Sequence, residues 1–272
     1  MIKLRHLFLA LTLLAAPVAA QQQEFIFAVN EGVTYRITPQ ESRDRYKEIA
    51  EILSKALKRP VKVVPVDNYV KLRQQLEAKT YDLAYVHPAH HSLRAMRDQG
   101  YKLVVNTKGW DKYKASFLMK PDGPFKQPTD VLAVEMVMPD PDSITAWMVR
   151  ATLRDLGGDL STIKLGTTRY QDGIPFYLEN GFYQIGITAS GAVVKDWQSK
   201  GGKILFQSKE VPIKNLIAHP SVSAEDVEKI RAIFLGLESS KEGQAILEKL
   251  KFKGYMLGDD KQMVELTKWL GI

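Results

Sequence analysis

Hydrophobic and polar positions alternate along the first half of the chain in two patterns, short apolar runs and longer amphipathic stretches. The short runs are rich in β-branched and aromatic residues, which predicts strands at 25–29, 61–66, 82–86 and 103–106. Apolar residues at helical spacing predict helices over the intervening stretches 39–57, 69–78 and 88–97. In the first helix, Tyr46, Ile49 and Leu53 share one face. Strands that alternate with helices predict an α/β architecture, here with parallel strand pairing.

A Pro/Gly-rich segment at 120–128 interrupts this pattern, and a second α/β set follows it. We expect strands in this set at 131–138, 163–167, 184–188 and 203–206. The expected helices are one that starts near Ser143 and ends at Gly157 and Gly158, two at 174–180 and 192–200, and tail stripes at 227–237 and 263–270. Two α/β sets predict two lobes with a ligand cleft between them: lobe 1 from 24–115 plus 210–272, and lobe 2 from 116–209.

The first twenty residues have the pattern of a cleavable secretory signal. Lys3 and Arg5 precede a short apolar run, and the small residues of Ala-Pro-Val-Ala-Ala stand just before Gln21. The run is shorter than the roughly 20 apolar residues of a membrane-spanning helix. We therefore predict cleavage after residue 20, a periplasmic mature protein and no stable membrane insertion.

Composition narrows the classes of partner. The signal holds two of the 38 basic residues and none of the 31 acidic ones, so cleavage lowers the net charge from +7 to +5. The lysines are scattered and form no basic stripe, which argues against nucleic acid as a partner. A weakly positive field suits a small anionic ligand. Because the chain has no cysteine, disulfides and thiol chemistry are excluded.

The segment Asp-Pro-Asp-Ser-Ile-Thr-Ala at 140–146 follows a predicted strand and opens a predicted helix. Ser143 and Thr145 place hydroxyl groups beside the free backbone N–H groups of a first helical turn. Such an end carries about half a positive charge and binds oxyanions. A plain N-cap would use the same residue types. Both interpretations stay open from spacing alone.

Three of the five histidines, His87, His90 and His91, stand at the start of another predicted helix. They could converge as metal ligands, but no nearby cluster of Asp, Glu or Cys residues completes the ligand shell, so we expect a polar helix start and no metal site. Tyr69, Tyr85 and Trp147 could wall a pocket or belong to the core. Asp172 also opens a helix, where capping and ligand contact are both possible.

Catalytic signatures are weak. Ser161 and Lys164 match Ser-x-x-Lys, without the companion motifs that give this short pattern meaning. The sequence contains no Gly-x-Ser-x-Gly, His-Glu-x-x-His, phosphate-binding loop or dinucleotide fingerprint. We expect neither an enzyme nor a cofactor.

Three segments carry a resemblance to one family: Pro-Val-Asp-Asn-Tyr at 65–69, Tyr-Asp-Leu-Ala-Tyr at 81–85 and Asp-Pro-Asp-Ser-Ile-Thr-Ala at 140–146. On these segments the chain resembles the periplasmic phosphate/phosphite/phosphonate-binding proteins of ABC transporters. The similarity runs through nearly all of the mature chain. Pro-Val-Asp-Asn-Tyr at 65–69 matches the family's loop with a ligand-contacting tyrosine, and Tyr-Asp-Leu-Ala-Tyr at 81–85 is similar to its Asp-x-Ala-aromatic strand. The segment 140–146 resembles the family's Asp-Pro-x-Ser-Thr-Ser-Gly, whose hydroxyl and N–H groups hold phosphonate oxygens. Ile144, Val86 and Gln184 depart from the family pattern, so the ligand within this class stays open.

The resemblance implies a two-lobed periplasmic binding protein fold of the type II-like class. It implies a protein that captures a small oxyanion and delivers it to an ABC transporter permease. The implied ligand-binding residues are Tyr69, Tyr85, His87, Ser143, Ile144, Thr145 and Asp172. Two alternatives share this scaffold: a soluble periplasmic sensor that partners a membrane kinase, and a periplasmic enzyme.

Overall fold

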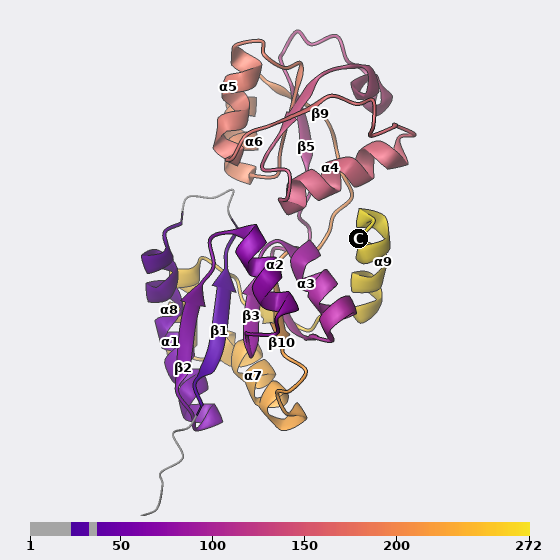
Figure 1. The fold of residues 1–272 in the computed structure, drawn as a ribbon. Helices are drawn as coiled ribbons and strands as arrows, with labels where there is room; N and C mark the ends of the chain where they lie inside the picture. Colours follow the sequence, from indigo (N-terminus) through magenta and orange to yellow (C-terminus); the bar gives the residue numbers. More distant parts are fainter. Residues whose placement is uncertain (1–22, 33–36) are drawn as a thin grey trace, which may run out of the picture.

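Two β-sheets with helices packed around them organise the chain (Figure 1). The structure, a computed structural model, describes residues 23–32 and 37–272. The predicted signal at 1–20 lies outside these residues. No helix in the described ranges combines the length and the apolar character that crossing a membrane requires.

The first sheet has the order β11-β4-β10-β3-β1-β2. Strand β1 (Phe25–Asn30) pairs in parallel with β2 (Val61–Pro65) and β3 (Leu83–Val86), as the sequence predicts. Beyond β3 the prediction of parallel pairing is wrong. Strand β10 (Asn215–Ala218) inserts between β3 and β4 (Lys102–Thr107) and is antiparallel to both. The short β11 (Tyr255–Met256) completes the edge, so the tail of the chain supplies two strands of this sheet.

The second sheet has the order β7-β6-β8-β5-β9 and comes from the middle of the chain. Its strands are β5 (Ser116–Met119), β6 (Met136–Met138), β7 (Leu165–Thr167), β8 (Ile185–Thr188) and β9 (Lys203–Gln207). The strand expected over 131–138 is shorter than predicted, because Pro128–Ala133 forms a 3₁₀ helix that begins at a proline. Strands β5 and β9 are antiparallel neighbours. Strand β5 follows the connection from β4 of the first sheet, and β9 precedes the connection back to β10 of that sheet.

The helices follow the predicted amphipathic stretches closely. In α1 (Pro39–Leu57), Thr38 and Glu41 form a capping box that fixes the first turn. The tail helix α8 (Lys241–Leu250) was not predicted. The remaining helices are α2 (Tyr69–Glu77), α3 (Ala89–Arg94), a π-helical turn (Ala95–Gln99), α4 (Ile144–Asp155), a 3₁₀ turn (Gln171–Gly173), α5 (Ile174–Glu179), α6 (Gly191–Ser199), α7 (Ala224–Gly236), a 3₁₀ turn (Leu237–Ser239) and α9 (Asp260–Leu270).

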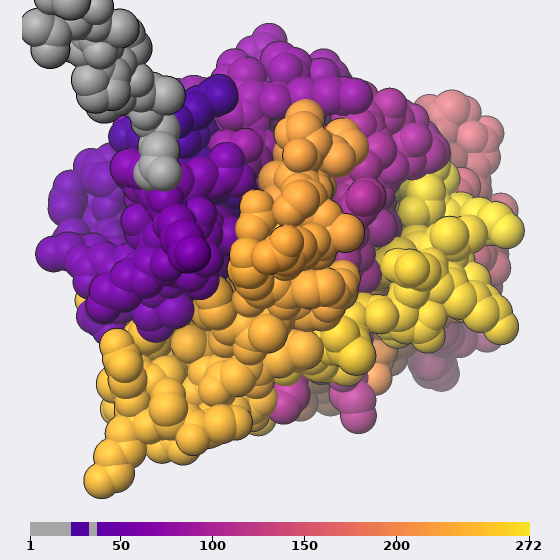
Figure 2. Space-filling model, turned by 90° about the horizontal axis from the view of Figure 1, so that it is seen from below, coloured from indigo at the N-terminus to yellow at the C-terminus, as the bar shows by residue number. Residues whose placement is uncertain are grey.

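Separate apolar clusters stabilise the two sheets. Helices α1, α7 and α8 cover one face of the first sheet. Figure 2 shows the tail of the chain, which holds α7 and α8, beside the N-terminal elements. Helix α9 contacts both parts: it packs against α3, while Met263, Leu266 and Leu270 join the cluster around α4. The lobe limits at 115 and 210 stay a prediction, with α9 in contact with both sets of elements.

Candidate functional site

The amino end of α4 meets helices of the first sheet. Its N-cap, Ser143, is buried, and its Oγ accepts a hydrogen bond from the backbone N–H of Ala146 at 3.2 Å. The preceding Asp142 forms an ion pair with Arg73 of α2. The first N–H groups of a helix have no partner inside it, and they carry partial positive charge. A positive helix end is thus placed at the junction of the two sheets.

A polar network surrounds the side chain of Thr145, which is buried in the first turn of α4. Thr145 Oγ1 lies 3.4 Å from the hydroxyl of Tyr113, and Gln171 Nε2 donates to that hydroxyl at 3.1 Å. Gln171 Oε1 in turn accepts from Thr188 Oγ1 at 2.9 Å and from the N–H of Ala189 at 2.6 Å. Hydroxyl and amide groups from four separate segments therefore converge beside α4.

His87 extends this network toward the first sheet. It lies directly after β3, fully buried, with its ring centroid 6.2 Å from that of Tyr113 and 6.3 Å from that of Trp110. Gly32 has φ +92°, and a Cβ there would lie 2.6 Å from His87 Cδ2, so only glycine fits. Burial, with a smaller contribution from Lys214, lowers the pKa of His87 well below its ordinary value. His87 is therefore neutral at pH 7 and can exchange hydrogen bonds with a ligand.

On the other side of the α4 terminus, aromatic and imidazole rings pack in a row. Tyr69 lies 5.1 Å from His91, His91 lies 4.0 Å from His90, and His90 lies 5.5 Å from Trp147, all between ring centroids. Burial lowers the pKa of His91 to about 3 and that of His90 well below its ordinary value. The sequence shows no cluster of acidic residues near these histidines, but the fold brings Asp142 Oδ1 to 3.4 Å from His90 Nε2.

A pocket of about 370 Å³ opens between the loop before α2 and the loop before α4. Asp67, Tyr69, Asp140, Asp142 and Arg169 contribute to its lining. Burial raises the pKa of Asp140, and the charge of Arg169 opposes that shift. The volume of this pocket suits a small molecule. Because it holds three carboxyl groups, the Thr145 side of the α4 terminus is the better environment for an anion.

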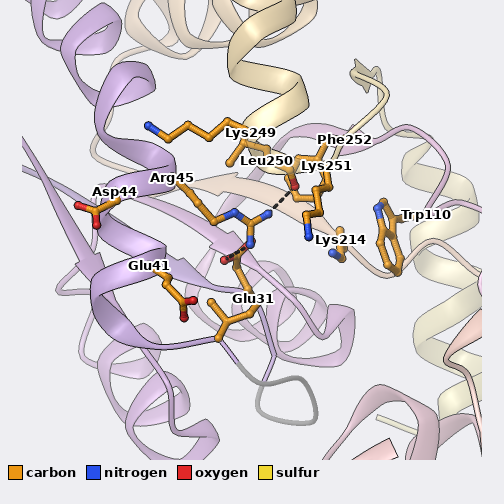
Figure 3. Close-up of a pocket in the computed structure, with 11 residues that line it drawn as sticks. Glu31, Glu41, Asp44, Arg45, Trp110, Lys214, Lys249, Leu250, Lys251 and Phe252 are labelled. Carbon is orange, nitrogen blue, oxygen red and sulfur yellow. Dashed lines mark hydrogen bonds and ion pairs between the residues drawn. The ribbon is translucent and has the colours of Figure 1, made fainter. Parts of the chain in front are cut away.

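A second pocket, of about 580 Å³, lies beside α1 and the end of α8 (Figure 3). In its lining, Arg45 donates to Glu31 at 2.8 Å and to the carbonyl oxygen of Leu250. The Lys214 ammonium lies 3.6 Å from the ring centroid of Trp110, and burial lowers the pKa of Lys214 to about 7 against the opposing charge of Glu31. Trp110 therefore both lines this pocket and lies against His87.

The structure brings Tyr69, His87, Ser143 and Thr145 together around the helix end that Ile144 opens. The side chains of Tyr85, Ile144 and Asp172 have different surroundings. Tyr85 is fully buried in the first core, 5.6 Å from Tyr46 between ring centroids, and burial raises its pKa. Ile144 is buried in the apolar cluster of the second sheet. Asp172 is exposed. The ligand contacts of all seven residues stay predictions.

Several residues of the site carried no usable sequence signal. Trp110 and Tyr113 lie in the connection between β4 and β5, and Gln171 precedes the predicted Asp172. Polar and aromatic residues in loops are common, so nothing in the pattern marks these three. The position of Tyr113 after the last strand of the first α/β set was the one available hint, since ligands bind near the points where connections change direction.

This arrangement supplies hydrogen-bond donors without a strong charge of either sign. Hydroxyl groups, an amide, neutral imidazole and the N–H groups of a helix end can together replace the hydration of a small oxyanion. Such a set is suited to reversible binding.

Comparison with known proteins identifies the relatives of this chain. A sequence model of the family "ABC transporter, phosphonate, periplasmic substrate-binding protein" matches residues 32–263. No curated protein sequence matches the chain.

Solved structures share its fold. The PhnD1 protein of Prochlorococcus marinus in complex with methylphosphonate has a TM-score of 0.70 at 14% identity, covering 90% of this chain and 96% of that one. A Xanthomonas citri protein bound to ATP has a TM-score of 0.75 at 10% identity, covering 91% and 97%. A binding protein component of a phosphonate ABC transporter from Pseudomonas aeruginosa has a TM-score of 0.67 at 15% identity, covering 91% and 85%. The predicted two-lobed α/β binding-protein fold is confirmed.

Proposed function

The chain belongs to the family of periplasmic substrate-binding proteins of phosphonate ABC transporters, and from this premise we propose that its ligand is a small phosphorus oxyanion held at the amino end of α4. Phosphonate, phosphite and phosphate are the candidates. The observation that carries the proposal is the convergence of Thr145, Tyr113 and Gln171 beside the helix terminus. The family acts in transport, so capture and release, not turnover, is the role of this site.

The expected contacts follow from the donors present. The N–H groups of the first turn of α4 and the hydroxyls of Ser143 and Thr145 would receive the oxyanion. His87 and Tyr113 would complete its shell, while Tyr69 would contact the ligand from the first sheet. An exposed Asp172 would have to approach any organic substituent from the surface. Tyr85 and Ile144, both in apolar clusters, would act by supporting neighbouring backbone.

Ligand binding would favour a closed arrangement of the two predicted lobes, because the donors come from both sheets. A ligand shifts such an equilibrium only by its difference in affinity for the two states. The closed form would then dock on the permease of an ABC transporter. Cleavage of a signal at residues 1–20 would release the mature protein into the periplasm.

Intrinsic fluorescence tests the proposal. Trp147 packs on His90 and under Arg94, beside the proposed site, so its emission should respond to a bound anion. Protein purified in phosphorus-free buffer is titrated with phosphate, phosphite and methylphosphonate, with sulfate as the comparison anion. We expect a saturable change with at least one phosphorus compound at lower concentration than with sulfate. No response to any of the three, in protein shown to be folded by circular dichroism, would refute the ligand class.

A further inference from the structure

Three metal-ligating side chains from two separate parts of the chain meet next to the α4 terminus. One ligand atom from each of His90, His91 and Asp142 lies within 4.8 Å of the other two. The histidines come from α3, which packs with the first sheet, and Asp142 comes from the loop before α4 of the second. No cluster of acidic residues stands near the histidines in the sequence; the fold brings Asp142 beside them.

The imidazoles in this cluster lack hydrogen bonds. Both are at most 1% exposed, and within the described part of the chain none of their four ring nitrogens has a hydrogen-bond partner. A buried polar atom left unsatisfied costs about 1–3 kcal/mol. Buried histidines normally bond through at least one nitrogen. Two adjacent buried imidazoles without a hydrogen bond, with the Asp142 carboxylate 3.4 Å from one of them, indicate that a ligand belongs between them.

We propose that this cluster binds one divalent transition-metal ion of the zinc type, through His90, His91 and one carboxylate oxygen of Asp142. Two imidazoles and a carboxylate form a familiar zinc ligand set, and three protein ligands leave a fourth position for water or an anion. In a tetrahedral site with bonds near 2.0–2.1 Å the ligand atoms lie about 3.3 Å apart. Small side-chain rotations bring atoms within 4.8 Å to that spacing.

The surroundings of Asp142 resemble the outer shell of a metal site. Arg73 bonds to Oδ2, and Trp147 Nε1 donates to Oδ1 at 3.3 Å, so the carboxylate is oriented from two sides. Oδ1 also faces His90. Partners of this kind fix the direction of a metal ligand and contribute to its affinity.

Nearby charges include some that repel a bound cation and some that attract it. Arg73 and Arg94 repel a cation, and Arg94 lies 4.7 Å from the ring centroid of Trp147, close to His90. Asp67 and Asp140, which line the adjacent pocket, attract a cation. The bound ion would also join the two sheets, since its ligands come from both.

Zinc titration tests the site independently of the phosphorus ligand. Metal-free full-length protein in phosphorus-free buffer is titrated with Zn²⁺ by calorimetry. We expect one ion per chain, and at least a tenfold weaker affinity in Asp142→Asn, His90→Gln and His91→Gln. His219→Gln is the matched control, because His219 lies outside the cluster and bonds to Ser221. Its affinity should equal that of the unaltered protein.

Because His90 is fully buried, the Asp142→Asn variant is decisive if a histidine variant misfolds; the carboxylate is partly exposed and the change keeps its shape. Zn²⁺ should raise the melting temperature of the original protein, and at the same concentration it should raise that of folded Asp142→Asn by less. Absence of stoichiometric binding, or equal affinity in Asp142→Asn and the original protein, would overturn the site. Either result leaves the oxyanion proposal intact, since no phosphorus compound is present.

Discussion

Replacing Thr145 by valine separates an anion-binding role from a structural one. The change preserves shape and removes a single hydroxyl group, buried and 3.4 Å from the Tyr113 hydroxyl. If that hydroxyl donates to an oxyanion, the charge-assisted bond contributes about 1.5–3 kcal/mol. At 1.4 kcal/mol per decade this is a loss of about tenfold to a hundredfold in affinity. Stability should fall by less, about 1 kcal/mol, because Tyr113 keeps its bond from Gln171.

The assay is calorimetric titration with the phosphorus compound that binds best, beside a melting curve for each variant. Thr152→Val is the matched control. Thr152 lies on the same helix, is buried, and bonds the carbonyl oxygen of Met148 at 2.8 Å. Its loss should lower stability and leave affinity unchanged. If Thr145→Val binds within twofold of the original protein, the hydroxyl does not contact the ligand and the reasoning fails.

Three further predictions follow from the same residues. Ser143→Ala should lower stability by about 1 kcal/mol through the lost N-cap and also weaken oxyanion binding; chemical denaturation and calorimetry together show whether both change. Ile144→Thr should destabilise the protein by about 1–3 kcal/mol without tightening binding, because the new hydroxyl would enter the apolar cluster of the second sheet; denaturant titration measures this. Acidification from pH 6.5 to 5 should lower the free energy of unfolding, because the unfolded chain protonates at His87 near 6.5 while the folded chain does not. Melting curves recorded across this range should show the free energy of unfolding falling by up to about 1.4 kcal/mol per pH unit because of His87. The variant His87→Gln should show a smaller dependence of this free energy on pH.

Local patterns were enough to place most helices and strands. The limits of α1 agree with the prediction, because its caps and apolar face are local features. The pairing of β4 could not be read in this way. Its neighbours β10 and β11 lie over a hundred residues away in the sequence, and no local pattern records which strand a distant segment will join.

At the site, the sequence by itself determined the helix end that Ser143 caps, because capping depends on neighbouring residues. It also contained the segment 140–146, which resembles the family motif. Tertiary structure alone decided what faces that end. It brought Tyr113 and Gln171 to Thr145, and it brought Asp142 to His90. It also placed Tyr85 in the core, where Tyr46 contacts its ring. Composition and periodicity report burial along one element, whereas the contacts of a site depend on how two sheets and their connections pack in space.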